Sequence, residues 1–397
     1  MDQLWLREAL RVVELGSGIS AAYGARLLAD FGADVIKVEK PGGGDDARRA
    51  GPFPDDIPHV EKSGLFLYLN FNKRGIQLDV ETSTGAILLS SLLADADVVI
   101  ENLGPGKLDE LQSMSGSWPD RLVLCSISHY GQDGPRADSM SSEIGAYASG
   151  GMMYITGDGS REPVKHGLHQ AAHLAGTNAA SAILAATLLS RHTGIGQRID
   201  IAEQETVAQE VFPGLGIYSH NGGVMKRVPP TFNGLVASSP METNDGYIMP
   251  SYAGLGEWQT VVAFLDTPEL GEERFMTPEG RQAHGSEIDA LLRPKFRMMS
   301  KHDLFHTGQE WGLTFTAVQT AEDLSNCPHL GERGFFIEQH HPVAGVVRMP
   351  GMVPFGSIVD RTPVRPAPTL GQHTAAVLEA LGVDREDLPI LAAAGII

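Results

Sequence analysis

The stretch LRVVELGSGISAAYGARLLADFGADVIKVE (Leu10–Glu39) decides the fold that the sequence predicts. Its first part, Leu10–Gly16, is a short β-branched run that ends at a glycine, as a buried strand often does. Ser20–Gly32 follows with small and apolar residues at helical spacing and a glycine stop, and Ala33–Glu39 is a second strand-like run. A strand, a helix and a strand in this order predict two parallel strands joined by a covering helix.

The same alternation continues further along the chain. A helix is predicted over Thr82–Ala96, and buried strands are predicted over Asp97–Asn102 and Arg121–Ser128. Leu174–His192 is predicted to be a long helix with small or apolar residues on every side, which is typical of a helix buried in a core or an interface. The first part of the chain is therefore predicted to be an α/β, Rossmann-like domain with a parallel sheet between helices.

The length of the chain predicts more than one domain. A single compact core rarely holds 397 residues, so we expect two domains. The composition changes near residue 220, where Ser219–Gly234 is rich in glycine and proline, as linkers are. The expected order is a large domain, a linker, a smaller α/β domain, a returning linker and a C-terminal helix packed on the large domain, over residues 1–205, 206–227, 228–330, 331–370 and 371–397.

Charge and composition exclude several classes of partner. The formal net charge of −19 argues against nucleic acid and anionic membranes, because both require a basic surface. A phosphorylated small ligand remains compatible, since local cations and helix N-termini bind phosphate on acidic proteins. No apolar run reaches about 18 residues, so no membrane span is predicted. The two cysteines and the absence of a secretory signal pattern predict a cytoplasmic protein without a disulfide framework.

Three histidines lie close together in VKHGLHQAAHLAG (Val164–Gly176), at positions 166, 169 and 173. His169 and His173 are four residues apart, so they share a face if this segment is helical. A metalloprotease helix carries a glutamate between such histidines, whereas Gln170, Ala171 and Ala172 stand here. We therefore predict no metal site, and the histidines remain either general bases or ordinary polar and packing residues.

Three turns are candidates for ligand contacts. GSGIS (Gly16–Ser20) lies between the first strand and helix, but it lacks the full G-x-G-x-x-G pattern of dinucleotide-binding proteins. Lys73 and Arg74 are adjacent cations, which form either a phosphate site or a solvated turn. ENLGPGKLDELQ (Glu101–Gln112) follows a buried strand and turns sharply into a helix. Such strand-to-helix turns at the carboxyl edge of a parallel sheet are the usual ligand position.

Six blocks of sequence, in this order, resemble the class III CoA-transferases, which include formyl-CoA transferase, carnitine CoA-transferase and α-methylacyl-CoA racemase. The blocks span nearly the whole chain and read LLADFGADVIKVEKPGGGDDAR, NKRGIQLD, ADVVIENLGPGKLDEL, SISHYGQDGPRAD, TGIGQRIDIAEQETVA and PAPTLGQHTAAVLEALG. The resemblance implies a Rossmann-like large domain, a small domain on long linkers, and two chains interlocked as a dimer. It also implies a CoA thioester and a carboxylic acid as substrates, with no metal.

The resemblance further implies that CoA lies on the large domain, with its phosphates and adenine near the first strand-to-helix turn. The implied contacts are Ile19, Lys40, Arg48, Asn72, Lys73, Arg74, Gly104 and His129. The acidic net charge is compatible with this site, because most of these cations cluster locally.

One residue departs from the family pattern. Family transferases use an aspartate as nucleophile on the acyl-CoA thioester. Counting back from the anchor TGIGQ places Ala172 at that position, and Gly176 then falls on the family's glycine four residues later. No aspartate or glutamate occurs between Glu162 and Asp200 that could take its place. The histidine and aspartate of the racemase branch are also missing, because Ser142 and Glu143 stand at the corresponding motif.

Three interpretations follow for the function. In the first, the chain is the aspartate-less subunit of a heteromeric CoA-transferase, and its partner is a paralogue that carries the aspartate. If the chain has no such partner, it is expected to be a homodimer. Alternatively, it is an active acyl-CoA enzyme in which Glu143 or His173 carries out transfer, hydrolysis or lyase chemistry in place of the missing aspartate. A third possibility is a non-catalytic protein that binds CoA or acyl-CoA.

Overall fold

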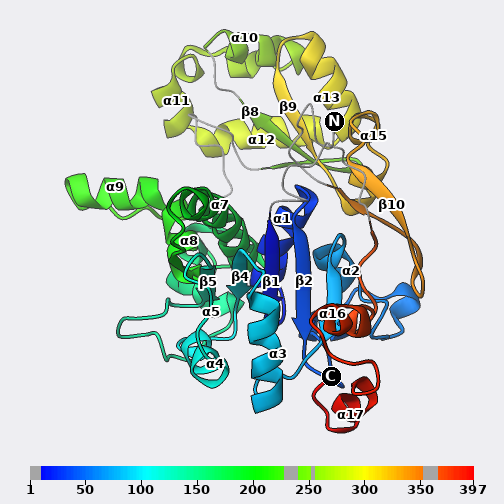
Figure 1. Ribbon diagram of the computed structural model, residues 1–397. Helices are drawn as coiled ribbons and strands as arrows, with labels where there is room; N and C mark the ends of the chain where they lie inside the picture. The colour runs from blue at the N-terminus through cyan, green and yellow to red at the C-terminus, as the bar shows by residue number, and fades with distance from the viewer. Residues whose placement is uncertain (1–9, 228–239, 252–254, 352–364) are drawn as a thin grey trace. The chain divides into compact units, whose positions relative to one another are not determined.

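The computed structural model describes residues 10–227, 240–251, 255–351 and 365–397, and it divides into two compact units (Figure 1). Unit 1 comprises Met1–Met153, Lys165–Val224 and Gly331–Ile397, and unit 2 comprises Tyr154–Val164 and Met225–Leu330. The predicted layout differs in two respects: residues 154–164 belong to unit 2, and the expected linker 206–227 is largely helical. The expected boundary at residue 228 and part of the returning linker lie outside the described residues.

Unit 1 is built on a six-stranded sheet, whose paired strands all run parallel. Its spatial order is β3-β2-β1-β4-β5-β6, so the order reverses between β1 and β4. This gap between β1 and β4 is a topological switch point, where α/β proteins place their ligands. The predicted α/β class is confirmed, and the strands are β1 (Arg11–Leu15), β2 (Asp34–Glu39), β3 (Arg74–Gln77), β4 (Val98–Glu101), β5 (Val123–Ser128) and β6 (Arg198–Ala202).

Helices cover both faces of this sheet because alternate strand residues point to opposite sides. On β1, Val12 packs in a core with α1 (Ser20–Asp30) and α7 (Gln170–Thr193). The next residue, Val13, packs in a second core with α3 (Ser83–Leu93) and α4 (Lys107–Ser115). The sheet is therefore sandwiched, and its parallel strands are buried on both faces.

Helix α7 is the longest helix among the described residues and forms the main wall of the first core. By length and composition alone it could cross a membrane, but it packs beside α1 as a core helix of unit 1. The two helices approach closely at Gly24 and Gly176. A β-carbon on Gly176 would lie 2.7 Å from the Ser20 carbonyl oxygen and 3.0 Å from the Gly24 nitrogen. Only residues without a β-carbon allow this separation.

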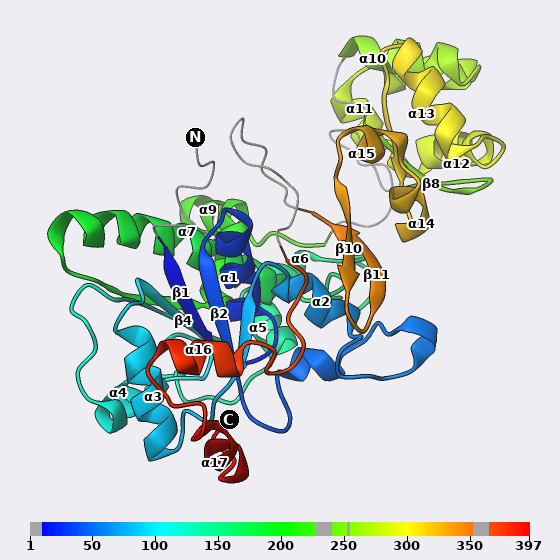
Figure 2. The ribbon, with the colours of Figure 1, turned by 45° about the vertical axis from the view of Figure 1, so that its right-hand side comes forward.

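The C-terminal segment completes the edge of the sheet at β3. The His373 ring accepts a hydrogen bond from the Gly75 amide at 3.1 Å, and the Thr374 hydroxyl accepts one from the Gln77 amide at 2.9 Å. Helix α16 (Thr374–Ala380) thus begins beside β3, as Figure 2 shows. The edge strand is covered, which satisfies backbone groups that would otherwise be free to pair with another chain.

Further helices, strands and 3₁₀ turns complete unit 1. They are the 3₁₀ turns Asp46–Arg49 and Pro54–Asp56, the hairpin β10 (Phe336–His341) and β11 (Gly345–Pro350), and the helices α2 (Gly64–Asn70), α5 (Glu143–Ser149), α8 (Glu203–Glu210), α9 (Phe212–Asn221) and α17 (Leu388–Ala393). Helix α6 (Met152–Ile155) spans the boundary between unit 1 and unit 2.

Unit 2 has a three-stranded antiparallel sheet with its own apolar core. A turn at Asn244–Gly246 joins its first two strands. Trp258, Phe296 and Phe315 are among the residues that fill the core. The elements are β7 (Met241–Thr243), β8 (Gly246–Ser251), β9 (Thr314–Val318), the 3₁₀ turns Pro268–Gly271 and Glu273–Phe275, α10 (Leu255–Phe264), α11 (Pro278–Ala283), α12 (Gly285–Phe296), α13 (Lys301–Glu310), α14 (Ala321–Ser325) and α15 (Pro328–Glu332).

Candidate functional site

A cavity of about 920 Å³ lies in unit 1, where the strands of the parallel sheet end. All six strands contribute residues at or just beyond their carboxyl ends, which places the cavity at the edge of the sheet that contains the switch point between β1 and β4. The lining includes the segment Gly16–Ser20 after β1, Lys40 and Asp45 after β2, Asn102–Pro105 after β4, Ser128 and His129 at β5, and Glu203 after β6. Ile19, Lys40, Gly104 and His129, all expected as CoA contacts, are therefore brought together.

Asn102 holds the first turn of the cavity in shape. Its Oδ1 atom accepts a hydrogen bond from the Ser17 amide at 3.0 Å. Its Nδ2 atom donates to the Ser17 carbonyl at 2.7 Å and to the Ser20 hydroxyl at 3.2 Å. Gly16, with φ of +110°, brings the backbone so close that any β-carbon would overlap Asn102 Oδ1. These hydrogen bonds join the loop after β1 to the loop after β4, on either side of the switch point.

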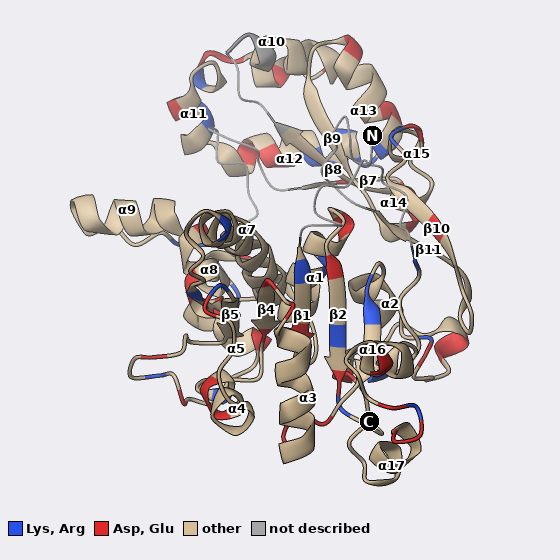
Figure 3. Cartoon of the chain, in the orientation of Figure 1, with Lys and Arg blue, Asp and Glu red and all other residues tan. Residues whose placement is uncertain are grey.

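Buried charges form the floor beneath this turn. Asp45 accepts hydrogen bonds from the Gly18 amide at 2.8 Å and from the Ala47 amide at 2.7 Å. Its other oxygen pairs with Lys37 at 2.6 Å. Burial opposes ionisation, but the Lys37 charge and these hydrogen bonds hold the pKa of Asp45 below its usual range. Lys37 on β2 also pairs with Glu14 on the adjacent strand β1, at 2.6 Å. Both of these central strands therefore carry charged residues (Figure 3).

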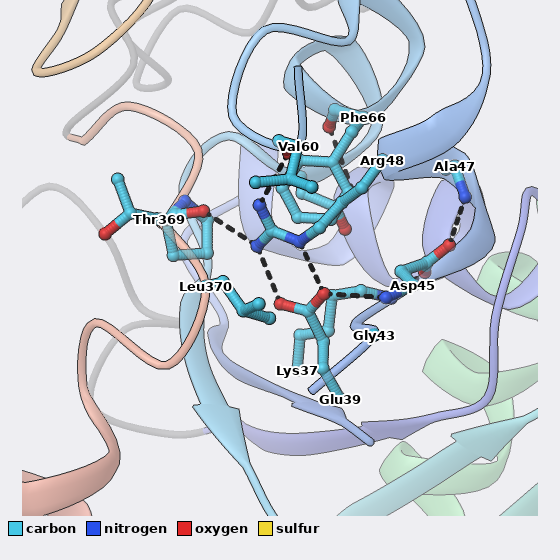
Figure 4. Close-up of polar contacts among 12 residues, drawn as sticks. Lys37, Glu39, Gly43, Asp45, Ala47, Arg48, Val60, Phe66, Thr369 and Leu370 are labelled. Atoms are coloured by element: carbon cyan, nitrogen blue, oxygen red, sulfur yellow. Dashed lines mark hydrogen bonds and ion pairs between the residues drawn. The ribbon is translucent and has the colours of Figure 1, made fainter. Parts of the chain in front are cut away.

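Arg48 occupies a different place from the one expected of a CoA contact. Its guanidinium is fully buried and donates to both carboxylate oxygens of Glu39, each at 2.7 Å (Figure 4). It also donates to Glu61 at 2.8 Å and to the Pro368 carbonyl at 3.1 Å, and it stacks 3.6 Å from the centre of the Phe66 ring. Because its donors are engaged in this way, the structure gives Arg48 the role of fixing the loop after β2.

Lys73, Arg74 and Asn72 are likewise held outside the cavity lining. Lys73 is buried and pairs with Glu14 at 2.7 Å, and burial lowers its pKa to about 8. The side chain of Arg74 pairs with that of Asp34. Asn72 exchanges hydrogen bonds with the backbone of Arg365. The expected contact of these residues and of Arg48 with CoA stays a prediction, which would require their present partners to be replaced.

Three other cations do line the cavity: Lys40, Arg49 and Lys107. Each pairs with a carboxylate at the protein surface, which is Glu81 for Lys40, Asp46 for Arg49 and Glu110 for Lys107. Such exposed pairs contribute little to stability, on the order of 0–1 kcal/mol. A phosphate can therefore replace these surface carboxylates at a small cost in free energy. The buried ion pairs of Lys37 with Asp45 and Glu14 cannot be replaced in this way.

At the other end of the cavity, the first turn of α7 meets the start of α5. Ala172 lines the cavity on α7. Glu143, the first residue of α5, also lines it. The Glu143 carboxylate accepts a hydrogen bond from the Ala171 amide at 3.1 Å and pairs with Lys165 at 3.1 Å. Glu143 therefore caps the N-terminus of α7, where the helix dipole favours a negative charge.

His129 and Glu203 form a second polar pair in the cavity. Nδ1 of His129 lies 2.8 Å from a carboxylate oxygen of Glu203, whose side chain is buried at the start of α8. The hydrogen bond that His129 donates to Glu203 raises the pKa of His129, despite partial burial that opposes it. Glu143 adds to this rise through its charge. The two carboxylates therefore stabilise the protonated imidazole.

The three neighbouring histidines have separate environments. The His166 ring is hydrogen-bonded to the Tyr147 hydroxyl, and His169 lines the cavity. His173 is not part of the lining: its ring packs edge-on against Tyr23, with ring centres 4.6 Å apart, and burial lowers its pKa. Of the two catalytic candidates from the sequence, the structure thus brings Glu143 to the cavity but not His173. Within the described ranges, no group of three metal-ligating side chains occurs.

Several cavity residues are not evident as site residues from the sequence. Asn102 lies within one of the candidate turns, but nothing in the local pattern identifies its amide as the bridge between two loops. Asp45 and Glu203 lie within two of the blocks that carry the family resemblance, but the resemblance does not give either of them as a site residue. Their position in the sequence is the signal that could identify Asn102 and Glu203 as site residues, because they directly follow strands β4 and β6.

Comparison with known proteins agrees with this architecture. CoA-transferase family III matches residues 8–374 of the chain. The human succinyl-CoA:glutarate CoA-transferase is 29% identical over 409 residues, which cover 100% of this chain and 91% of the human protein. The succinyl-CoA:(R)-benzylsuccinate CoA-transferase subunit BbsE of Thauera aromatica is 29% identical and matches 94% of this chain and 93% of its own length.

The fold has a counterpart among solved structures. A CAIB/BAIF family protein from Brucella suis superposes with a TM-score of 0.82 at 29% sequence identity, covering 94% of this chain and 98% of that protein. The match to the family extends over nearly the whole chain and includes both units. The chain is therefore a member of CoA-transferase family III.

Proposed function

We propose that the chain binds a CoA thioester in the unit 1 cavity and acts as the aspartate-less subunit of a heteromeric CoA-transferase. The single observation that carries this proposal is the position of Ala172. The cavity is intact, and Ala172 lines it where the family resemblance expects the nucleophilic aspartate. An alanine methyl group cannot attack a thioester, so we propose that a partner chain supplies the carboxylate that accepts the acyl group from CoA.

The charges around the cavity support a particular orientation of the ligand. Lys40, Arg49 and Lys107 line it together with the turn after β1, and their surface carboxylate partners are replaceable. These cations suit the phosphates of CoA. Ala172, His129 and Glu143 suit the thioester end, because they line the same cavity and the resemblance assigns the reacting position to Ala172.

The relatives support a subunit role. The Thauera aromatica relative carries the word subunit in its name, so at least one protein similar to this chain works within a CoA-transferase of more than one chain. We propose the same for this chain, with an aspartate-bearing paralogue as partner, a CoA thioester and a carboxylic acid as substrates, and the cytoplasm as location. In the absence of such a partner, the chain forms a homodimer that binds acyl-CoA.

One observation favours a second function, in which the chain is active by itself through Glu143. This carboxylate lines the cavity and contacts the amide next to Ala172. Against a nucleophilic role, both of its oxygens are already engaged, one by the α7 amide and the other by Lys165. We therefore rank Glu143 as a structural cap ahead of a replacement nucleophile.

Calorimetric titration of the purified chain with CoA and succinyl-CoA tests the binding site. We expect Lys40→Gln and Arg49→Gln to weaken binding by about threefold to tenfold each, as loss of an ion pair to phosphate does. Arg198→Gln is the matched control, because Arg198 pairs with Asp109 at the surface and is not among the lining residues. Equal effects of all three substitutions would place the ligand elsewhere.

A transfer assay tests the subunit role. The chain alone should form no new CoA ester from succinyl-CoA and a set of carboxylic acids. When it is co-expressed with an aspartate-bearing member of the same family from the same organism, the two should purify as one complex that transfers CoA. Transfer by the chain alone would contradict the proposal, and loss of that activity in Glu143→Gln would then identify Glu143 as its replacement nucleophile.

A further inference from the structure

His129 and Glu203 form a pair to which the family resemblance assigns no part in the transfer step, since it implies only that His129 contacts CoA. The pair spans two strand ends, since His129 follows β5 and Glu203 follows β6. These two strands are neighbours in the sheet, with Ser128 registered against Ala202, so the backbone itself places the two side chains together. The ring of His129 is partly exposed while the Glu203 carboxylate is buried behind it.

This arrangement has the geometry of an oriented base. Glu203 engages Nδ1 of His129 at 2.8 Å, so Nε2 is the ring nitrogen that can receive a proton from a molecule in the cavity. A buried carboxylate that fixes the tautomer of an imidazole is the recurring device by which histidine becomes a general base. Both residues line the cavity, so the base faces the ligand space.

The pair lines the same cavity as Ala172, which the proposed function assigns to the reacting position. Glu143 connects the two, because its charge acts on His129 and its carboxylate accepts a hydrogen bond from the Ala171 amide. Ala172, the next residue, has a side chain shorter by a carboxylate than the aspartate expected there. The structure thus combines an oriented histidine with space next to the expected position of the thioester carbonyl.

We propose that His129 is a general base, oriented by Glu203, through which this chain by itself hydrolyses the CoA thioester in its cavity. The inference rests on the proposed function only in that a CoA thioester binds there. Nε2 of His129 takes a proton from water while the water oxygen bonds to the thioester carbonyl carbon. The carbon–sulfur bond then breaks, and the imidazolium returns its proton to the CoA sulfur. Acyl-CoA and water thereby give a carboxylic acid and free CoA.

Glu203 is a positioning residue in this scheme, and its role has a signature in the pH profile. Hydrolysis requires neutral His129, so the rate rises with pH through the pKa of this group. The carboxylates that face the ring, Glu203 on α8 and Glu143 on α5, raise that pKa. Replacement of Glu203 by glutamine removes the larger of these effects, so the midpoint of the profile should move to lower pH while the maximal rate falls.

The test measures release of CoA thiol from succinyl-CoA by the purified full-length chain, alongside calorimetric binding of the same ligand. We expect His129→Gln to lower kcat by about 100-fold to 10,000-fold, as loss of a general base does, while Kd changes less than about threefold. His129→Gly should regain part of the rate when imidazole is added. His192→Gln is the control: this exposed histidine lies in the last turn of α7, outside the cavity lining, and its replacement should leave the rate unchanged.

The outcomes separate the two proposals. If succinyl-CoA and CoA do not bind, the proposed function fails and this inference fails with it. If they bind but no thiol is released above the uncatalysed rate, the hydrolytic role of His129 is refuted while the proposed binding function stands. That role is equally refuted if His129→Gln hydrolyses at the wild-type rate, or if Glu203→Gln leaves the midpoint of the pH profile where it was.

Discussion

Replacement of Gly16 by alanine tests whether the turn after β1 depends on its contact with Asn102. The φ angle of Gly16 is +110°, and an added β-carbon would overlap Asn102 Oδ1 and lie 3.1 Å from the Asn102 backbone nitrogen. Gly18, two residues away, has φ of +84° and open space around a β-carbon, with no atom within 4 Å. An alanine at either position would therefore have to adopt a left-handed backbone conformation, but the alanine at position 16 would in addition clash with Asn102.

The structure gives the size of the difference. An alanine with positive φ costs about 1–2 kcal/mol of folding free energy in either variant. In Gly16→Ala, Asn102 is also displaced and loses its hydrogen bonds to the Ser17 amide, the Ser17 carbonyl and the Ser20 hydroxyl. At about 1 kcal/mol net for each of these bonds, we expect Gly16→Ala to lower the free energy of unfolding by about 3 kcal/mol more than Gly18→Ala does.

Urea unfolding monitored by circular dichroism measures both variants, and the transition of unit 1 is the one to compare. Asn102→Ala in the Gly16→Ala background completes the comparison, because it removes the clashing amide and should recover part of the lost stability. Equal destabilisation by Gly16→Ala and Gly18→Ala would refute the reasoning, since it would mean that Asn102 does not constrain the turn.

Three further predictions concern other parts of unit 1. Arg48→Met should destabilise the protein by about 3–5 kcal/mol in chemical unfolding because it leaves a buried carboxylate unpaired, whereas Arg49→Met should change stability by no more than about 1 kcal/mol. Gly176→Ala should lower the free energy of unfolding by about 1–3 kcal/mol, because its β-carbon would press on the Ser20 carbonyl, and equal stability would contradict the close helix contact. His129→Asn should lower the free energy of unfolding below pH about 6.5, and the loss should become smaller as the pH rises. The reason is that a group whose pKa is raised in the folded state stabilises the protein only while it is protonated. A difference in the free energy of unfolding between wild type and variant that does not change between about pH 6 and 9 would contradict the pairing.

The fold was largely predictable because local patterns determine it. Strands such as Leu10–Gly16 are β-branched runs closed by glycine, and the helices between them carry regular apolar spacing and glycine stops. The parallel sheet then follows from the connection rule rather than from any single residue. The location of the site was predictable for the same reason, since ligands bind where strands end at a switch point.

The roles of individual cations were not predictable from local sequence. Arg48 and Arg49 are adjacent and chemically identical, yet one is buried against Glu39 and the other lies in an exposed pair with Asp46. What separates them is long-range: Arg48 also donates to the Pro368 carbonyl, far away in the chain. Spacing cannot show which charges meet across such distances, and for that reason it does not reveal that four of the expected CoA contacts have partners within the protein.

The histidine candidates show the same limitation at shorter range. The predicted helix begins at Leu174, whereas α7 begins at Gln170 and includes His173. The spacing also does not show which neighbour the ring meets, which is Tyr23. His129 and Glu203 are separated along the chain and come together only because β5 and β6 pair in register. Their relation could be inferred only once the strand order was known.

The central claim is that the cavity retains the site of an acyl-CoA reaction from which the nucleophile at position 172 is missing. Restoring it tests this claim most directly. In Ala172→Asp, the new carboxylate should attack the thioester carbonyl of bound succinyl-CoA, which releases CoA thiolate and forms a mixed anhydride. The thiolate should then attack the aspartyl carbonyl of this anhydride, which releases succinate and leaves an aspartyl-CoA thioester. Mass spectrometry on the peptide that contains residue 172 should detect this thioester, and hydroxylamine should abolish it. The wild-type chain should carry no such adduct. A folded Ala172→Asp variant that binds succinyl-CoA but never acquires CoA on this residue would contradict the account.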